Sequence, residues 1–279
     1  MIIDFHTHTF PDKIASAAIA KMQLDCHSAA FSDGTLAGLK ATAGSAGIDL
    51  SVIQPVATKP GQVSSVNELA AGLNGQDGIV YFGCMHPDFE DYRSELHRLY
   101  DAGIKGIKVH PVYQGANIDD ARYLRIFECC AELGLWVLTH GGDDIGFPGL
   151  VRCSPEMCRV ALRQVPGLKM VVAHMGGWRN WERVVDNLLD TEAVLDTAFS
   201  IGNIVPLDDA YYNDKDTALL SDEQFCSLVE AFGSERVLFA TDSPWSDRRA
   251  EVERIKAMPL SEAEKAAILG GNAEKILFG

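Results

Sequence analysis

The chain has 279 residues, of which 47% are hydrophobic and 23% charged, a composition typical of a soluble globular protein with a substantial core. Asp and Glu total 39 against 24 Lys and Arg, and the resulting net charge of −15 disfavours binding to nucleic acid, whose phosphates are also negative. No uninterrupted run of about 18 apolar residues predicts a membrane span, and the opening MIIDFHTH lacks a signal-peptide pattern. We therefore expect a cytoplasmic protein that binds neither nucleic acid nor a membrane.

The seven cysteines form no CxxC pair, and their odd number argues against a complete disulfide framework. We expect reduced thiols. Cys153 and Cys158 are five residues apart, and one interpretation is that they bind a soft metal. We favour the other interpretation, which is ordinary packing.

Short β-branched or aromatic runs alternate along the chain with longer segments of helical period, which is the pattern of parallel strands joined by crossover helices. Eight strands are predicted, in chain order at 2–5, 49–56, 78–84, 106–110, 135–140, 169–174, 193–198 and 236–242. The clearest helices are predicted at 88–103, 119–134, 154–167 and 221–233, because each segment opens with an acidic or Ser/Asp cap and closes at Gly.

Eight such units predict an α/β protein with a closed (β/α)8 TIM barrel, forming one domain over residues 1–279. A doubly wound open sheet shares the alternation and differs in whether the first and last strands meet. The GxGxxG and GxxxxGK[ST] motifs of nucleotide-binding open sheets are missing, which favours the barrel. Residues 200–220 lack clear periodicity and are predicted to form a lid or binding loop.

Polar residues gather at the C-terminal ends of the predicted strands, where barrel enzymes have their active sites. These residues are His6, His8, His110, His140, His174 and Asp242. His6 and His8 are two apart in an extended segment, so their side chains emerge on one face, about 6 to 7 Å apart, and can bind one ion. Imidazole together with carboxylate suits zinc, manganese or ferrous iron.

Four other polar residues have simpler interpretations. His86 closes the third strand and is interpreted as a structural cap, with a pocket contact as the alternative. Asp4 either orients one of the histidines or makes an ordinary hydrogen bond at the strand end. His27 and His97 lie away from strand ends and are assigned no chemistry.

Five motifs follow one another along the whole chain: DFHTH at 4–8, GIKVHP at 106–111, THGG at 139–142, AHMGG at 173–177 and TDSPW at 241–245. In this order they resemble the amidohydrolase superfamily, specifically the amidohydrolase-related (amidohydrolase 2) branch, which includes aminocarboxymuconate-semialdehyde decarboxylase and related metal-dependent hydrolases. An HxH motif alone is weak, but the ordered set is specific.

The resemblance implies an enzyme with one divalent metal ion, zinc before manganese or ferrous iron, bound by His6, His8, His140 and Asp242. It also implies that His174 is a catalytic residue beside the metal, and we add His110 as a catalytic candidate in contact with the substrate's carboxylate. Lys108 alternates in phase with His110. A carboxylated lysine that bridges two metals is one hypothesis for it, and packing or pairing with an acid is the one we favour.

Three functional hypotheses follow from these residues. The first is hydrolysis of a small amide, lactone or carboxylated metabolite by metal-activated water, with Asp242 accepting the water proton and His174 stabilising the oxyanion. The second is non-oxidative decarboxylation of a small unsaturated or aromatic acid, a carbon–carbon lyase reaction with the same ligands. The third is a catalytically inert ligand-binding barrel. The first two differ in loop residues that the motifs do not reach; both take a small-molecule substrate, and a homodimer is expected.

Overall fold

The computed structural model describes residues 1–208 and 211–279, and its chain divides into two compact units. The first unit comprises Met1–Ser51 and Thr197–Gly279, and the second comprises Val52–Asp196. The single domain expected over residues 1–279 stays a prediction. In the described part of the chain, no helix is both long and apolar enough to cross a membrane.

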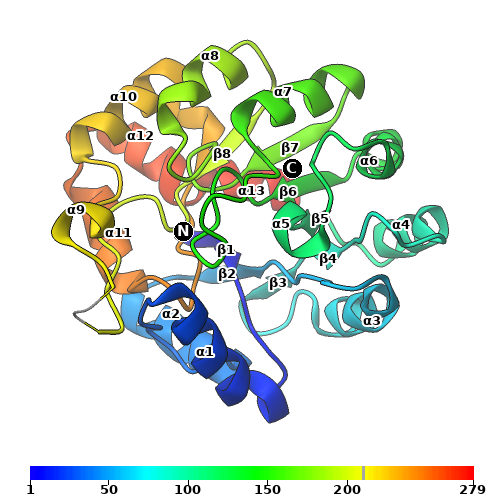
Figure 1. The fold of residues 1–279 in the computed structure, drawn as a ribbon, viewed down its shortest axis with the longest axis horizontal. Helices are drawn as coiled ribbons and strands as arrows, with labels where there is room; N and C mark the ends of the chain where they lie inside the picture. Colours follow the sequence, from blue (N-terminus) through cyan, green and yellow to red (C-terminus); the bar gives the residue numbers. More distant parts are fainter. Residues whose placement is uncertain (209–210) are drawn as a thin grey trace. The chain divides into compact units, whose positions relative to one another are not determined.

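The second unit is built on a parallel sheet whose strands follow chain order from β4 to β8 (Figure 1). The strands of this sheet in the unit are β4 Gly83–Cys84, β5 Gly106–Val109, β6 Trp136–Thr139, β7 Lys169–Val172 and β8 Val194–Asp196, and the unit also contains β3 Ile79–Tyr81. Val109 pairs with Thr139, and Thr139 pairs with Val172. Because these three residues are the last of β5, β6 and β7, the three strands end at one level, and the residues that follow them share one edge of the sheet.

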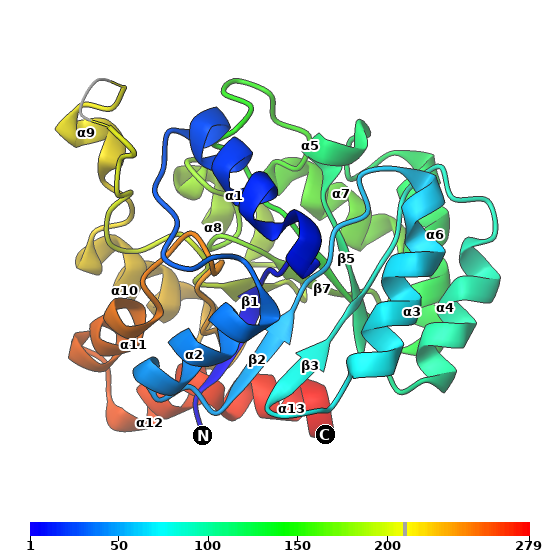
Figure 2. The same ribbon diagram turned by 90° about the horizontal axis from the view of Figure 1, so that it is seen from below.

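The helices of this unit are α3 Val63–Leu73, α4 Tyr92–Asp101, α5 Pro111–Gln114, α6 Ala121–Leu133, α7 Pro155–Gln164 and α8 Val184–Leu188. Both α6 and α7 start where the sequence predicts a cap: the Asp120 and Ser154 side chains accept hydrogen bonds from backbone N–H groups of the first turn. Gly134 ends α6 with a φ of 70°, a conformation that glycine adopts without steric cost. Figure 2 shows α3, α4 and α6 side by side.

The first unit contains β1 Ile3–Thr7, β9 Val237–Leu238, α1 Asp12–Cys26, α2 Leu36–Ala46, α9 Asp214–Thr217, α10 Asp222–Phe232, α11 Arg248–Ala257, α12 Glu262–Ala266 and α13 Asn272–Phe278. Strand β2, Leu50–Ile53, lies where the chain passes between the units. The Phe5 N–H donates to the Phe239 carbonyl at 2.9 Å, and Thr7 and Ser243 form a parallel bridge. The first and last strand segments therefore meet, which is the feature that distinguishes a barrel from an open sheet.

Each of the eight predicted strands overlaps an observed strand, with shifted or shorter bounds, and two differ in a way that the hydrogen bonds explain. The predicted strand 78–84 divides into β3 and β4 on either side of Phe82. The predicted strand 236–242 shortens to β9 because the N–H groups after Leu238 find other acceptors. Phe239 donates to the Ile268 carbonyl, and Ala240 donates to the Thr197 side chain. These bonds replace a strand ladder while leaving the backbone satisfied.

The predicted loop 200–220 is ordered by its own hydrogen bonds in the residues that the structure describes. Leu220 N–H donates to the Ser200 carbonyl at 3.0 Å, and Ile204 N–H donates to the Thr217 carbonyl at 2.9 Å. The segment also bonds to the residues that follow α1, because the Ala29 N–H donates to the Val205 carbonyl at 2.8 Å. Residues 209 and 210 lie outside the described residues, and the role of the segment as a lid stays a prediction.

Glu251 on α11 gives a pH-dependent contribution to stability. Burial, reinforced by the negative charges of Asp247 and Asp4 and opposed by Arg254, raises the pKa of this carboxyl to about 8. The folded protein therefore binds this proton more tightly than the unfolded chain, so the stabilisation present at low pH is lost as pH rises from about 4.5 to about 8.

We expect the free energy of unfolding of the wild type, relative to Glu251→Gln, to fall by about 1.4 kcal/mol per pH unit across this window. Urea unfolding at several pH values measures this difference. Glu253→Gln, an exposed change on the same helix, is the matched control and should follow the wild-type pH dependence. An equal slope for wild type and Glu251→Gln would contradict the prediction.

Candidate metal centre

Three predicted ligands meet in the first unit. His6 lies within β1, His8 follows it, and Asp242 follows β9. The Nε2 atoms of His6 and His8 are 3.1 Å apart, and Asp242 Oδ1 lies 3.6 Å from His6 Nε2 and 3.1 Å from His8 Nε2. The pairing of β1 with the last strand segment explains this convergence, because the Asp242 N–H donates to the His6 carbonyl at 2.9 Å.

The spacing of these three atoms fits one cation. Two ligand atoms bound to a tetrahedral ion at about 2.1 Å are separated by roughly 3.4 Å, and the observed separations run from 3.1 to 3.6 Å. Two imidazoles and a carboxylate are donors for zinc, manganese and ferrous iron. His6 is 1% exposed, whereas His8 and Asp242 are partly exposed, so the group can accept a further ligand from its open side.

The backbone around Asp242 is held in a conformation that non-glycine residues rarely adopt. Asp242 has a φ of 57°, and its carbonyl accepts the Trp245 N–H at 3.0 Å. His8 N–H donates to the Ser243 carbonyl at 2.7 Å. Strained residues of this kind persist where the surrounding bonds determine their geometry, and they concentrate at functional sites.

Asp4 anchors this arrangement from beneath. Its carboxylate is fully buried and accepts from Thr241 N–H at 3.0 Å, from the Thr241 hydroxyl at 2.6 Å and from Arg248 Nε at 2.9 Å. Of the two interpretations of Asp4, the hydrogen bond at the strand end therefore fits, because Thr241 and Arg248, and not a histidine, bond to its oxygens. Asp4 thus fixes the residue that precedes Asp242.

The second unit brings together the other three predicted site residues. His110, His140 and His174 follow β5, β6 and β7, whose shared end level places the residues that follow them at one edge. The rings of His110 and His140 stack with centroids 4.5 Å apart, and His140 Nδ1 lies 3.0 Å from His174 Nε2. The three imidazoles therefore form one chain of contacts.

Both ring nitrogens of His140 have partners within this unit. Its Nε2 lies 3.0 Å from the Asp143 carbonyl, and because that oxygen can only accept, Nε2 carries a hydrogen and donates. A neutral His140 then accepts from His174 at Nδ1. To bind a cation through Nε2, His140 must exchange the Asp143 carbonyl for the ion, and its membership of the metal site stays a prediction.

Two hydrogen bonds fix the backbone of His174. Its N–H donates to Asp196 Oδ1 at 2.9 Å, and its carbonyl accepts the Trp181 indole N–H at 3.0 Å. The φ of His174 is 61°, the second non-glycine residue of the predicted site in the left-handed region. The Trp181 indole thus positions His174.

Two residues that the sequence analysis missed support His110. Asp144 Oδ2 lies 3.5 Å from His110 Nε2, and His110, His140 and Asp144 form a second group whose geometry suits a cation. Gln114 accepts from the His110 N–H and donates to the carbonyls of Ala57 and Met85. Their positions, four residues after His140 and His110 respectively, were the only signal available in the sequence.

Glycine is required in the THGG motif for a close approach of two backbones. Gly142 has a φ of 83° and forms a parallel bridge with Trp178, and a Cβ at this position would lie 2.3 Å from Trp178 backbone atoms. A side chain here would push apart the two loops that follow β6 and β7.

His86, Lys108 and the cysteines are the other residues that the sequence analysis interpreted. His86 is a cap, as expected, because its Nδ1 accepts the Asp88 N–H at 3.1 Å, and burial lowers its pKa. Lys108 is 1% exposed within β5, and its carboxylation stays a hypothesis. The seven cysteines are free thiols, as expected. The 3.4 Å between the sulfurs of Cys153 and Cys158 exceeds the roughly 2.05 Å of a disulfide and fits packed thiols.

Comparison with known proteins identifies the family. The profile of the Amidohydrolase family matches residues 3–279. The chain is 27% identical over 207 residues to 2-amino-3-carboxymuconate-6-semialdehyde decarboxylase of Dictyostelium discoideum. This match covers 66% of the chain but only 56% of that relative, so the chain spans little more than half the length of the curated relative it matches.

Two solved structures show the fold. An uncharacterised TIM-barrel protein from Bordetella bronchiseptica has a TM-score of 0.76 at 17% identity, covering 99% of this chain and 98% of its own. The 5-carboxyvanillate decarboxylase of Novosphingobium aromaticivorans, complexed with manganese and 4-hydroxy-3-methoxy-5-nitrobenzoic acid, has a TM-score of 0.71 at 17% identity, covering 99% and 96%.

The chain belongs to the Amidohydrolase family. The predicted (β/α)8 TIM barrel is confirmed, and so is the identification of an enzyme of the amidohydrolase superfamily.

Removing Asp4 should destabilise the first unit severely. Asp4→Ala leaves Arg248 buried without its carboxylate, and we expect a loss of about 3 to 5 kcal/mol in the free energy of unfolding. Asp190→Ala is the control, because Asp190 pairs with Arg159 and Arg163 at the surface, where an ion pair contributes under about 1 kcal/mol. Equal losses for the two variants in urea unfolding would contradict the role given to Asp4.

Removing one ligand of the first-unit group should release the cation. We expect His6→Ala and Asp242→Asn to weaken binding of zinc or manganese at least about 100-fold, as measured by equilibrium dialysis with metal analysis. His97→Ala, an exposed change on α4, is the matched control and should retain wild-type stoichiometry. Stoichiometric metal in properly folded Asp242→Asn would count against this site.

Proposed function

We propose that the protein is a metal-dependent non-oxidative decarboxylase acting on a small unsaturated or aromatic acid. The observation that carries the proposal is the group of His6, His8 and Asp242, whose spacing suits one cation. The curated relative and the manganese-containing structural neighbour, both decarboxylases by name, favour this reaction over the hydrolysis that the sequence analysis ranked first. Hydrolysis has support only from the family as a whole.

The residues of the first unit fit the cation that this reaction needs. His6, His8 and Asp242 would hold it, and His140 is the fourth ligand predicted from the sequence. When bound, the ion would supply positive charge that stabilises the electron density left on the substrate as CO2 leaves. Zinc remains our first proposal. Manganese suits the same donors and is the metal bound by the 5-carboxyvanillate decarboxylase.

Decarboxylation leaves an electron pair on carbon, which must receive a proton. We assign the proton donor to His174, because its Nε2 shares a hydrogen with His140 Nδ1 at 3.0 Å. Asp196 and Trp181 hold the His174 backbone, so the ring keeps its place while the proton moves. General acid catalysis of this kind typically contributes about 10²- to 10⁴-fold to the rate.

In this proposal His110 contacts the carboxylate of the substrate. Asp144 lies 3.5 Å from His110 Nε2, and Gln114 fixes the His110 backbone, so the imidazole is oriented by two neighbours. The ring also contacts Tyr113 edge-on, with centroids 4.4 Å apart. We further propose a cytoplasmic location, which the seven free thiols support.

The proposal predicts release of CO2 from a 2,6-dihydroxybenzoate or muconate-like acid by protein loaded with zinc or manganese. We expect His174→Gln to retain the metal and to lose about 10²-fold or more in kcat, whereas Asp242→Asn should lose both metal and turnover. Mass spectrometry of the product and a coupled CO2 assay measure these outcomes.

A panel of amides, lactones and esters separates this reaction from hydrolysis. Turnover of any panel member without CO2 release would restore the hydrolase hypothesis. Metal-loaded, folded protein that turns over no acid and no panel member would instead support the inert ligand-binding barrel.

A further inference from the structure

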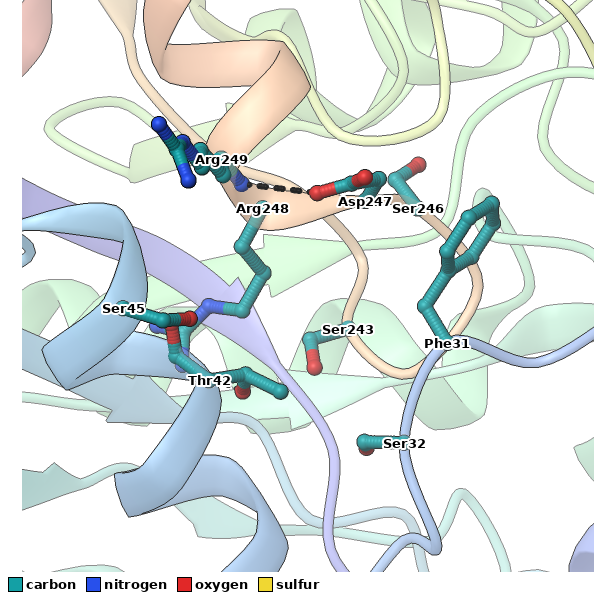
Figure 3. A pocket seen from close by; sticks show the side chains of 9 residues that line it. All are labelled: Phe31, Ser32, Thr42, Ser45, Ser243, Ser246, Asp247, Arg248 and Arg249. Atoms are coloured by element: carbon teal, nitrogen blue, oxygen red, sulfur yellow. Dashed lines mark hydrogen bonds between the residues drawn. The ribbon is translucent and has the colours of Figure 1, made fainter.

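The cavity beside α11 in the first unit, of about 220 Å³, is bordered by polar groups that do not converge (Figure 3). The Arg249 guanidinium is directed away from Ser243 and Ser246, and the exposed Asp247 carboxylate borders the same space. A guanidinium and a carboxylate favour ligands of opposite charge, so this cavity selects neither an anion nor a cation. The rings around His110 in the second unit indicate a ligand class more clearly.

Five aromatic rings of the second unit form one row of contacts. His140 contacts both His174 and His110, with ring centroids 4.7 and 4.5 Å apart. His110 also meets Tyr113 of α5 edge-on at 4.4 Å, and Tyr113 meets Phe147 edge-on at 5.2 Å. The row begins at His174, which is 4% exposed, and ends at Phe147, which is 39% exposed. It therefore leads from the buried part of the proposed active site to solvent.

The loop that carries Phe147 is tied to His110 by one side chain. Asp144 is 7% exposed, its Oδ2 lies 3.5 Å from His110 Nε2, and its Oδ1 accepts the Gly146 N–H at 2.8 Å. The Asp144 carbonyl accepts the Phe147 N–H at 2.9 Å. Because one buried residue contacts the imidazole and also orders the turn, the position of Phe147 is coupled to that of His110.

The tip of this loop is apolar although it is exposed. Phe147 and Leu150 are 39% and 37% exposed, and Pro148 between them is exposed as well. The Leu150 N–H donates to the Phe147 carbonyl at 3.0 Å, so the turn has a defined shape. A single exposed apolar residue is ordinary, but an ordered apolar turn next to polar groups that converge is typical of a ligand-binding surface.

We propose that Tyr113 and Phe147 bind the ring of an aromatic acid whose carboxylate contacts His110. This inference rests on the proposed function and deepens it, because it selects aromatic acids over open-chain ones. Aromatic rings attract one another in stacked and edge-to-face arrangements. The planes of Tyr113 and Phe147 are 83° apart, so a planar ring that stacks on one of them lies edge-on to the other. A saturated or open-chain acid cannot make both contacts.

Benzoate is the probe, titrated by calorimetry into the metal-loaded protein, and cyclohexanecarboxylate, with the same charge and a saturated ring, is the matched ligand. We expect the wild type to bind benzoate about 3- to 10-fold more tightly than cyclohexanecarboxylate, and Phe147→Leu to lose this preference. Tyr113→Phe keeps the ring and should retain it. Tyr100→Leu, which removes an exposed ring from α4, is the matched control and should also retain it. Benzoate should shift the amide signals of Gly146 and Phe147 in isotopically labelled protein.

Three outcomes of these titrations would overturn the inference. They are equal binding of the two acids by the wild type, an unchanged preference in folded Phe147→Leu, and benzoate that does not bind or leaves the Gly146 and Phe147 amides unshifted.

Turnover separates this inference from the decarboxylase proposal. With 2,6-dihydroxybenzoate we expect Phe147→Leu to raise KM at least about threefold while kcat stays near the wild-type value. CO2 release with an unchanged KM in Phe147→Leu would overturn the inference and leave the decarboxylase. Benzoate binding that depends on Phe147, without CO2 release from any acid, would overturn the decarboxylase and leave the aromatic-acid site.

Discussion

The buried carboxylate of Asp4 is the constraint on which the arrangement of the first unit depends. A charge without solvent must be fully hydrogen-bonded, and the donors come from residues more than two hundred positions away, the Thr241 backbone and hydroxyl and the Arg248 guanidinium. Satisfying Asp4 therefore draws the last strand segment against the first. The same pairing puts Asp242 beside His6, so the candidate metal group is a consequence of how one buried charge is neutralised.

Arg248 extends this effect into the helices. It also donates to the Leu39 carbonyl in the first turn of α2 and to the Ser51 hydroxyl at the start of β2. One guanidinium thus joins β1, α2, β2 and α11 inside the first unit. Arg248 turns inward to Asp4, while the next residue, Arg249, stays exposed.

In the second unit, the register of the parallel strands positions the histidines. Because β5, β6 and β7 end at one level, three successive histidines reach one edge, where stacking and hydrogen bonds link His110, His140 and His174. A row of imidazoles can hold a proton at a defined atom, and it can also exchange a hydrogen bond for a cation. Both properties suit the proposed decarboxylation, which needs positive charge near the substrate and a proton for the carbon that loses CO2.

The sequence by itself determined the alternation of strands and helices, the strand-end positions of six polar residues and the family, because hydrophobic period and motif order are local properties of the chain. It did not determine which partner each polar group takes. The sequence left open whether Asp4 orients a histidine or makes a hydrogen bond at the strand end, and the structure shows that it bonds to Thr241 and Arg248. Asp144, Asp196 and Gln114 carried no motif. Those partnerships depend on which segments, distant in sequence, are buried together, and only the tertiary structure decides that.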